Sequence, residues 1–261
     1  MGRKRRIIIT NNRQTLQFAY VVICSRNPKG AKMDFSRIFD YEKGLAANND
    51  REWFHKNHAE YEQAKKDFTG FVDFLRFKIC EEAPDLAPSI MYSEPKEWLY
   101  RVARDMRFHK NGPPYNPAFR AYISPDKKSW MPIGYYIHLF PGSSLFGTGI
   151  WCDSTEKMNG VRDYIIENFE EFEELMKSCP IPITGSRLKA MPKGYSPDEP
   201  ASEYLKFKDW ELILEIPDAD FTTFDETIDL LGRYVHLMEP MRKFLLRAAQ
   251  ATMSKDNEFE W

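Results

Sequence analysis

Five basic side chains lie within ten residues of one another in the stretch RVARDMRFHK, residues 101–110. They are Arg101, Arg104, Arg107, His109 and Lys110. A guanidinium is a planar fork of donors that matches carboxylates and phosphates, and an ammonium adds a point charge. If Arg104, Arg107 and Lys110 converge, they would bind a small anion. The residues leave a second interpretation open, in which Asp105 pairs with the arginines as a structural network.

Tyr136 and His138 are two residues apart in the stretch GYYIHLF. Side chains at this spacing on a strand share one face of a sheet. A histidine beside a tyrosine can act as a general acid or base near neutral pH, so His138 is the candidate catalytic residue. The same pair equally fits a half-buried histidine that is hydrogen-bonded to its neighbour. Because no nucleophile with an activating base is evident, it stays open whether the protein is an enzyme.

A second basic loop, KAMPKGY at residues 189–195, holds Lys193 and Tyr195 in a turn stiffened by proline and glycine. Loops on a rigid scaffold often carry binding groups. We expect this loop to fold over the segment 104–115, so that Lys193 closes a basic pocket with Tyr195 beside it. Tyr115 and Tyr136 would then line the pocket with aromatic rings.

Hydrophobic spacing predicts the elements that position these residues. Apolar side chains every three or four residues indicate helices at 35–45, 50–79, 155–176, 202–205 and 222–252, with a kink or break at Pro240. Asp50 would cap the second helix, and Lys65 falls on its water-facing side. Alternation indicates strands at 98–104, 119–123, 134–140, 144–151 and 210–216. Because short turns join three of them, we expect an α+β fold with a central antiparallel sheet flanked by long amphipathic helices.

Charge is unevenly distributed along the chain. Residues 1–32 hold eight lysines and arginines and no acid, whereas the remainder holds 29 basic against 39 acidic residues, a net charge of −10. Affinity for nucleic acid comes largely from lysine and arginine, so the acidic body gives no strong nucleic-acid signal and any anion site must be local. We expect residues 1–32 to be a disordered tail or an over-extended start, and residues 33–261 to form a single domain.

Four cysteines, at positions 24, 80, 152 and 179, stand far apart without a C-x-x-C pair. This pattern is typical of reduced thiols in a cytosolic protein rather than of a disulfide framework or a zinc site. No glycine motif for phosphates or dinucleotides appears, and no stretch has the length and apolarity of a membrane span. We therefore expect a cytoplasmic protein with no cofactor, no metal and no membrane association; its oligomeric state stays open.

Four blocks of sequence occur in a characteristic order: ANNDREWFHKNHAEYE, RVARDMRFHKNGPPYNPAF, GYYIHLFPGSSLFGTGIW and LKAMPKGYSPDEPASEYLKFKDW. Together they resemble the bacterial and fungal family called Domain of Unknown Function 2461, over about residue 33 to the C-terminus. The resemblance implies a compact cytosolic domain and no particular reaction. The family's usual block R-D-x-R-F-[ST]-K-[DN]-K-x-P-Y is matched at Arg104, Asp105, Arg107, Phe108, Lys110, Pro114 and Tyr115. His109 replaces the usual hydroxyl residue, and Gly112 and Pro113 stand where a lysine and a small residue are common.

The leading hypothesis for function is binding of a small anionic or phosphorylated ligand in a basic, aromatic-lined pocket. The alternative is a non-catalytic interaction module, whose arginines and exposed aromatics dock a protein or nucleic-acid partner. The two differ in shape, since a small-ligand pocket is concave and a docking face is broad, with aromatic and arginine anchors near its centre.

Overall fold

A computed structural model of the chain describes residues 35–105, 107, 112–125, 131–221 and 223–257. The predicted N-terminal extension lies outside this part, as do His109 and Lys110. The α-helices are α2 (Phe35–Ala47), α3 (Arg51–Lys56), α4 (His58–Glu82), α5 (Ala87–Ile90), α6 (Thr155–Glu167), α7 (Phe169–Ser178), α8 (Ser202–Leu205) and α9 (Phe224–Asn257). Two short 3₁₀ turns, η1 (Pro95–Glu97) and η2 (Asp218–Asp220), complete the helical elements of the described residues.

Five strands form one antiparallel sheet in the order β1-β2-β3-β5-β4. They are β1 (Phe119–Ile123), β2 (Gly134–Leu139), β3 (Ser144–Trp151), β4 (Ile183–Thr184) and β5 (Asp209–Ile216). Four of the five predicted strands are therefore confirmed, together with the α+β class. The two-residue β4 falls in a segment whose sequence predicts only a connector, because a strand this short has no alternation to detect.

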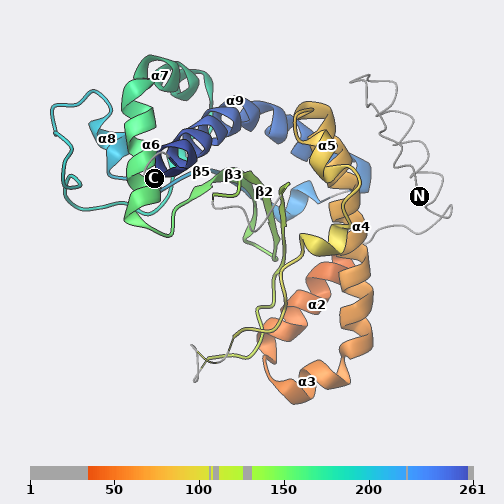
Figure 1. Ribbon diagram of the computed structural model, residues 1–261. Coiled ribbons are helices and arrows are strands. Elements are labelled where there is room, and N and C mark those ends of the chain that lie inside the picture. The colour runs from red at the N-terminus through yellow and green to blue at the C-terminus, as the bar shows by residue number, and fades with distance from the viewer. Residues whose placement is uncertain (1–34, 106, 108–111, 126–130, 222, 258–261) are drawn as a thin grey trace, which may run out of the picture.

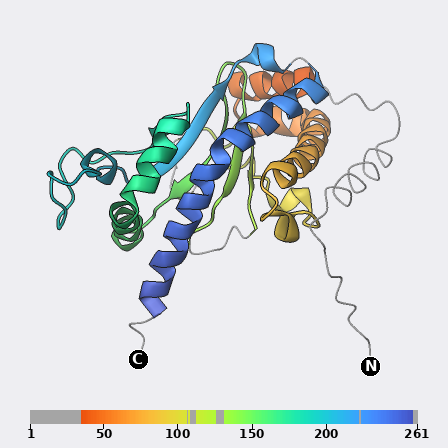
Figure 2. The same cartoon turned by 90° about the horizontal axis from the view of Figure 1, so that it is seen from above.

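The two faces of the sheet differ in what covers them. On one face, alternate residues such as Ala121, Ile137 and Phe146 are fully buried, and α4 and α9 pack against this face (Figures 1 and 2). On the other face, which we call the open face, the helices of the described chain leave the sheet uncovered (Figure 1). Its side chains are those of the intervening residues: Arg120, Tyr122, Tyr136, His138, Leu145, Trp151, Thr184, Asp209, Glu211, Ile213 and Glu215.

The segment 98–104 runs beside β1 but is not the strand that its sequence predicts. It makes two isolated bridges, Leu99 with Ala121 and Ala103 with Tyr115, which differ in register by two residues. Opposite this segment the chain carries prolines at positions 113, 114 and 117. Because proline has no N–H to donate, a continuous ladder cannot form there. The segment therefore covers the edge of β1 loosely.

The predicted helix at 50–79 is divided in two by Asn57. Asp50 caps α3 as expected, since its Oδ1 accepts a hydrogen bond from the backbone N–H of Trp53 at 2.8 Å. Asn57 then leaves the helical conformation (φ −104°, ψ 26°), and its amide nitrogen donates to the Trp53 carbonyl at 2.8 Å. Asparagine competes for backbone groups in this way, so the chain turns between α3 and α4.

Helix α9 packs against elements at both ends of the molecule. It contacts α4 near one end of the sheet, α6 and α7 near the other, and β3 between them (Figure 2). Pro240 lies inside α9, which continues to Asn257, so the proline does not break the helix. Among the described residues, no helix has the length and apolarity needed to cross a membrane.

Candidate functional site

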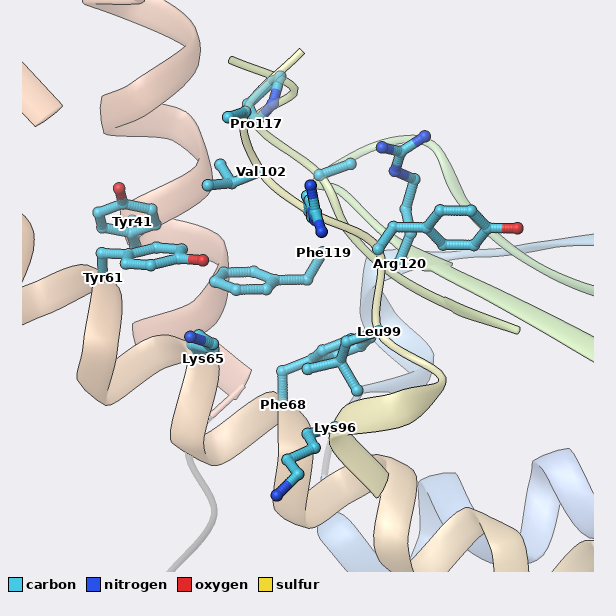
Figure 3. Close-up of a pocket in the computed structure, with 14 residues that line it drawn as sticks. Tyr41, Tyr61, Lys65, Phe68, Lys96, Leu99, Val102, Pro117, Phe119 and Arg120 are labelled. Atoms are coloured by element: carbon cyan, nitrogen blue, oxygen red, sulfur yellow. The ribbon is translucent and has the colours of Figure 1, made fainter. Parts of the chain in front are cut away.

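A cavity of about 520 Å³, which we call the edge pocket, opens beside the outer edge of β1. Its walls are the N-terminal half of α4, the segment 96–103 and the residues 117–120 that lead into β1 (Figure 3). The irregular pairing of the segment 98–104 leaves room here that a continuous strand would fill. The loose edge of the sheet thus creates the cavity.

Every charged residue that lines the edge pocket is a cation: Lys65, Lys96, Arg101 and Arg120. Lys65 lies 3.5 Å from a carboxylate oxygen of Glu62, and both side chains are about half exposed. An exposed pair of this kind contributes little free energy. For the other three cations, no described carboxylate lies within ion-pair distance. The pocket therefore carries a concentrated positive charge within an acidic protein.

Arg120 is the pocket cation with a buried donor that lacks a hydrogen-bond partner among the described residues. Its Cζ lies 5.1 Å from the centre of the Tyr100 ring, and its positive charge opposes the rise in the pKa of Tyr136 that burial causes. Its Nε is buried and has no hydrogen-bond partner among the described residues. A half-buried cation with an unpaired donor costs free energy, so Arg120 is the residue of the pocket that an anion would stabilise most.

Tyr136 and His138 lie on the open face next to Arg120. The Tyr136 hydroxyl is 3.3 Å from His138 Nδ1, and His138 is directly opposite Arg120 in the β1–β2 ladder. Burial lowers the pKa of His138, and the charge of Arg120 lowers it further; burial raises the pKa of Tyr136. Both side chains are therefore neutral near pH 7. No group of three or more metal-ligating side chains gathers anywhere in the described chain.

Aromatic rings form much of the remaining wall. The Tyr61 and Phe119 rings are nearly parallel, with centres 6.1 Å apart, and Tyr41 lies 5.7 Å from Tyr61 on the same side (Figure 3). Burial raises the pKa of Tyr61 to about 12, so its hydroxyl stays protonated. The Tyr41 hydroxyl is buried and lacks a partner in the described structure. The wall thus combines apolar surface with two neutral hydroxyl groups.

The predicted anion-binding arginines do not line the edge pocket. Arg107 has an 82% exposed side chain, and its guanidinium forms a bidentate pair with Asp105, with hydrogen bonds of 2.9 Å and 2.5 Å. This is the pairing that the sequence leaves open as the structural interpretation. The Arg104 side chain is exposed, and its backbone N–H donates to the Pro114 carbonyl at 2.9 Å. Lys110, the third predicted cation, lies outside the described residues.

Tyr115 belongs to the core instead of the pocket wall. Only 8% of it is exposed, and its ring stacks on Phe54 with centres 4.2 Å apart. Asn49 also fixes its backbone, because the asparagine side chain both donates to the Tyr115 carbonyl and accepts from its N–H at 3.0 Å. Stacking and the double hydrogen bond thus place Tyr115 in the core, next to α3, and not in the wall of the edge pocket.

The loop 189–195 does not close over the segment 104–115. The Tyr195 hydroxyl donates to Asp163 at 2.8 Å and lies 3.2 Å from the Asn159 carbonyl, both on α6. Helix α6 and helix α3, beside which Tyr115 lies, are far apart, α6 at the upper left and α3 at the bottom of Figure 1. Lys193 accordingly lies exposed at the α6 end. Tyr195 thus holds the loop against α6, away from the edge pocket.

Sequence reasoning missed the pocket residues because they come from separate segments. Lys65 looks like a water-facing helix residue, Lys96 is isolated in a turn, and Arg120 stands alone in a strand. One signal was available for Arg120. The hairpin of β1 and β2 sets it opposite His138, and the alternation of both strands predicts that the two side chains share a face.

Fold and site together define an α+β protein whose open-faced antiparallel sheet carries a cationic pocket at its edge. The chain belongs to the family described as conserved hypothetical protein (DUF2461), whose model matches residues 37–244. This match confirms the resemblance carried by the four sequence blocks, and the description names no reaction. No curated protein and no solved structure matches the chain.

Proposed function

We propose that this protein binds a small anionic ligand, with a phosphate or a carboxylate as its charged group, in the edge pocket. The observation that carries the proposal is the charge of the lining, where Lys65, Lys96, Arg101 and Arg120 face no acidic lining residue. Withdrawing an unpaired cation from water is costly. An anion that met the free donors of Arg120 would remove that cost and form strong, charge-assisted hydrogen bonds.

The size and surface of the pocket support a small organic ligand. Its volume of about 520 Å³ falls within the range of roughly 300–1,000 Å³ that is typical of small-molecule sites. Tyr61, Phe68 and Phe119 supply apolar wall, so a ligand with a carbon skeleton would bury surface there as well as pairing its charge. This combination favours a phosphorylated or carboxylated metabolite over a bare inorganic ion.

Calorimetric titration of the full chain with inorganic phosphate and fructose 6-phosphate tests the proposal. In the double variant Lys65→Met with Lys96→Met we expect affinity for fructose 6-phosphate to fall at least tenfold, which is about 1.4 kcal/mol. Thermal stability should change by less than about 1 kcal/mol, because methionine keeps the packing of the lysine stems, Lys96 is exposed and the pair of Lys65 with Glu62 is about half exposed. Fructose 6-phosphate should bind more tightly than phosphate alone.

A double variant, Arg104→Ala with Arg107→Ala, is the matched control for the loss of positive charge. Binding that disappears in this variant and survives in Lys65→Met with Lys96→Met would return the site to the segment 104–110. If the wild-type chain binds neither probe, the pocket proposal is wrong. The docking alternative would then gain weight, because Tyr100 and Trp151 are 48% and 69% exposed at the open face.

A further inference from the structure

The cations of the edge pocket do not converge on one point. Figure 3 shows Lys65 and Lys96 on one side of Phe119, and the Arg120 guanidinium on the other side, pointing away from both lysines. Arg120 still lines the pocket, but its guanidinium reaches the open face, where it lies over Tyr100. A single compact anion cannot contact charges that diverge in this way. The positive charge is divided between the pocket and the open face.

On the open face, Arg120 and His138 stand side by side. His138 is directly opposite Arg120 in the β1–β2 ladder, and the Tyr136 hydroxyl lies 3.3 Å from His138 Nδ1. When that hydroxyl donates to Nδ1, a neutral imidazole carries its proton on Nε2. The Nε2–H group can then donate to an anion beside the Arg120 guanidinium.

We propose that the ligand of the edge pocket carries two separate anionic groups, as a bisphosphorylated small molecule does. The lysines of the pocket hold the first group, and Arg120 together with the Nε2–H of His138 holds the second on the open face. This inference rests on the proposed function, since it specifies the ligand of the same site. It also gives His138 a role in ligand recognition in place of proton transfer.

The surroundings of His138 agree with an anion at this position. Arg120 faces it from β1, Tyr100 lies beside Arg120, and Tyr136 precedes it on β2. On β3 the residue opposite is Leu145, which is uncharged, and Glu215 follows only on β5, one strand further. Asp209 and Glu211 are also on β5, and the charge of Glu211 contributes to raising the pKa of Tyr136. The acidic side chains thus lie on the far side of β3, so an anion fits on the side of Arg120.

Titrations with three probes test the inference: fructose 6-phosphate, fructose 1,6-bisphosphate and pyrophosphate. Wild-type protein should bind the bisphosphate at least tenfold more tightly than the monophosphate. In His138→Leu this advantage should be lost, while affinity for fructose 6-phosphate changes less than threefold. His138→Gln keeps an N–H donor and should retain most of the advantage. Pyrophosphate, whose charges are adjacent, should bind no better than the monophosphate.

The outcomes separate this inference from the proposed function. Equal affinities for the mono- and bisphosphate would overturn the two-anion ligand and leave the anion pocket standing. Failure of all three probes to bind would remove both. A purely structural role of His138 would lower affinity for every probe alike in His138→Leu, and this result too would contradict the inference.

Nuclear magnetic resonance of the His138 ring gives a readout that a structural role would not move. Because Arg120 and burial hold the pKa of His138 below its usual value, a bound anion at Nε2 should raise that pKa. The shift should appear with fructose 1,6-bisphosphate and be absent with fructose 6-phosphate. A bisphosphate that binds tightly without moving the His138 resonance would place its second phosphate elsewhere.

Discussion

Arg162 on α6 and Arg120 on β1 are both withdrawn from solvent, but the protein uses their donors differently. Arg162 is 1% exposed; its Nε and Nη2 donate to the carbonyls of Leu205 and Phe207 at 2.8 Å and 2.9 Å, and its Nη1 donates to Asn159 at 2.8 Å. Arg120 leaves its buried Nε without a partner in the described structure. Burial of an arginine therefore does not by itself mark a binding site.

The same contrast holds for the two ends of the molecule. Buried side-chain atoms without a hydrogen-bond partner in the described chain belong to Tyr41, Glu42, Arg76, Arg120, Ser124 and Arg242. Tyr41 and Arg120 line the edge pocket, and Glu42 bonds the backbone of Phe119, which also lines it. None of these atoms lies in the described residues 155–208. At the α6 end the buried side-chain donors and acceptors are hydrogen-bonded, whereas at the pocket end some of them lack a partner among the described residues.

The largest expected effect comes from breaking the completed network. Arg162→Leu removes the donors of two buried carbonyl groups, so we expect a loss of about 4 kcal/mol in the free energy of unfolding, measured by urea titration. Arg187→Leu is the control, because its ion pair with Glu203 is exposed and contributes less than about 1 kcal/mol. Equal losses in the two variants would show that Arg162 does not hold the loop to α6.

Replacing Glu42, at the pocket end, should raise the free energy of unfolding by an amount that depends on pH. Burial raises the pKa of Glu42 to about 9, against 4.5 in the unfolded chain, so between these values the folded state holds a proton that the unfolded state releases. Stability attributable to Glu42 is therefore full below about pH 4.5 and falls as the pH rises toward 9. Glu42→Gln should stabilise the protein by about 3 kcal/mol at pH 8 and by little at pH 5.

The measurement for Glu42 is the midpoint of urea unfolding at both pH values, with Glu60→Gln as the control. Glu60 is exposed, and we expect its substitution to give the same small change at both values. A Glu42→Gln variant whose gain did not depend on pH would contradict a buried, protonated carboxyl group.

The smallest effect concerns the loop that the sequence assigns to the binding site. Tyr195→Phe removes the hydroxyl that bonds Asp163 and Asn159, and we expect a loss of about 1 kcal/mol in stability. Affinity for fructose 6-phosphate should be unchanged, since this loop lies at the end of the molecule opposite α3. A tenfold loss of affinity in the folded variant would place the loop at the site after all.

Much of the fold could be predicted because hydrophobic spacing reports burial directly. β1, β2, β3 and β5 alternate clearly, since only one of their faces is packed against helices. The errors in the predicted helices and strands arise where an asparagine changes the backbone conformation or where prolines remove backbone hydrogen-bond donors. Asn57 turns the chain inside an apolar pattern that continues through it, and the prolines opposite the segment 98–104 remove donors from a stretch that alternates on its own.

The site was less predictable, because the number of charged residues in a stretch of sequence does not show which of them are paired in the folded protein. The run from Arg101 to Lys110 stands out in the sequence, yet Arg107 is paired with Asp105. Arg120 and Lys65 stand out only after the chain has folded. Only Tyr136 among the predicted ligand-binding residues lies beside Arg120, and it was found because strand alternation fixes its neighbours.

Helix α9 also determines how the molecule should unfold. Since one helix contacts α4 at the pocket end and α6 and α7 at the other, neither end can lose its structure without exposing part of the apolar stripe of α9. Unfolding should therefore be cooperative over both ends. A ligand in the edge pocket would then slow amide hydrogen exchange in α6 as well as in α4, although α6 does not line the pocket.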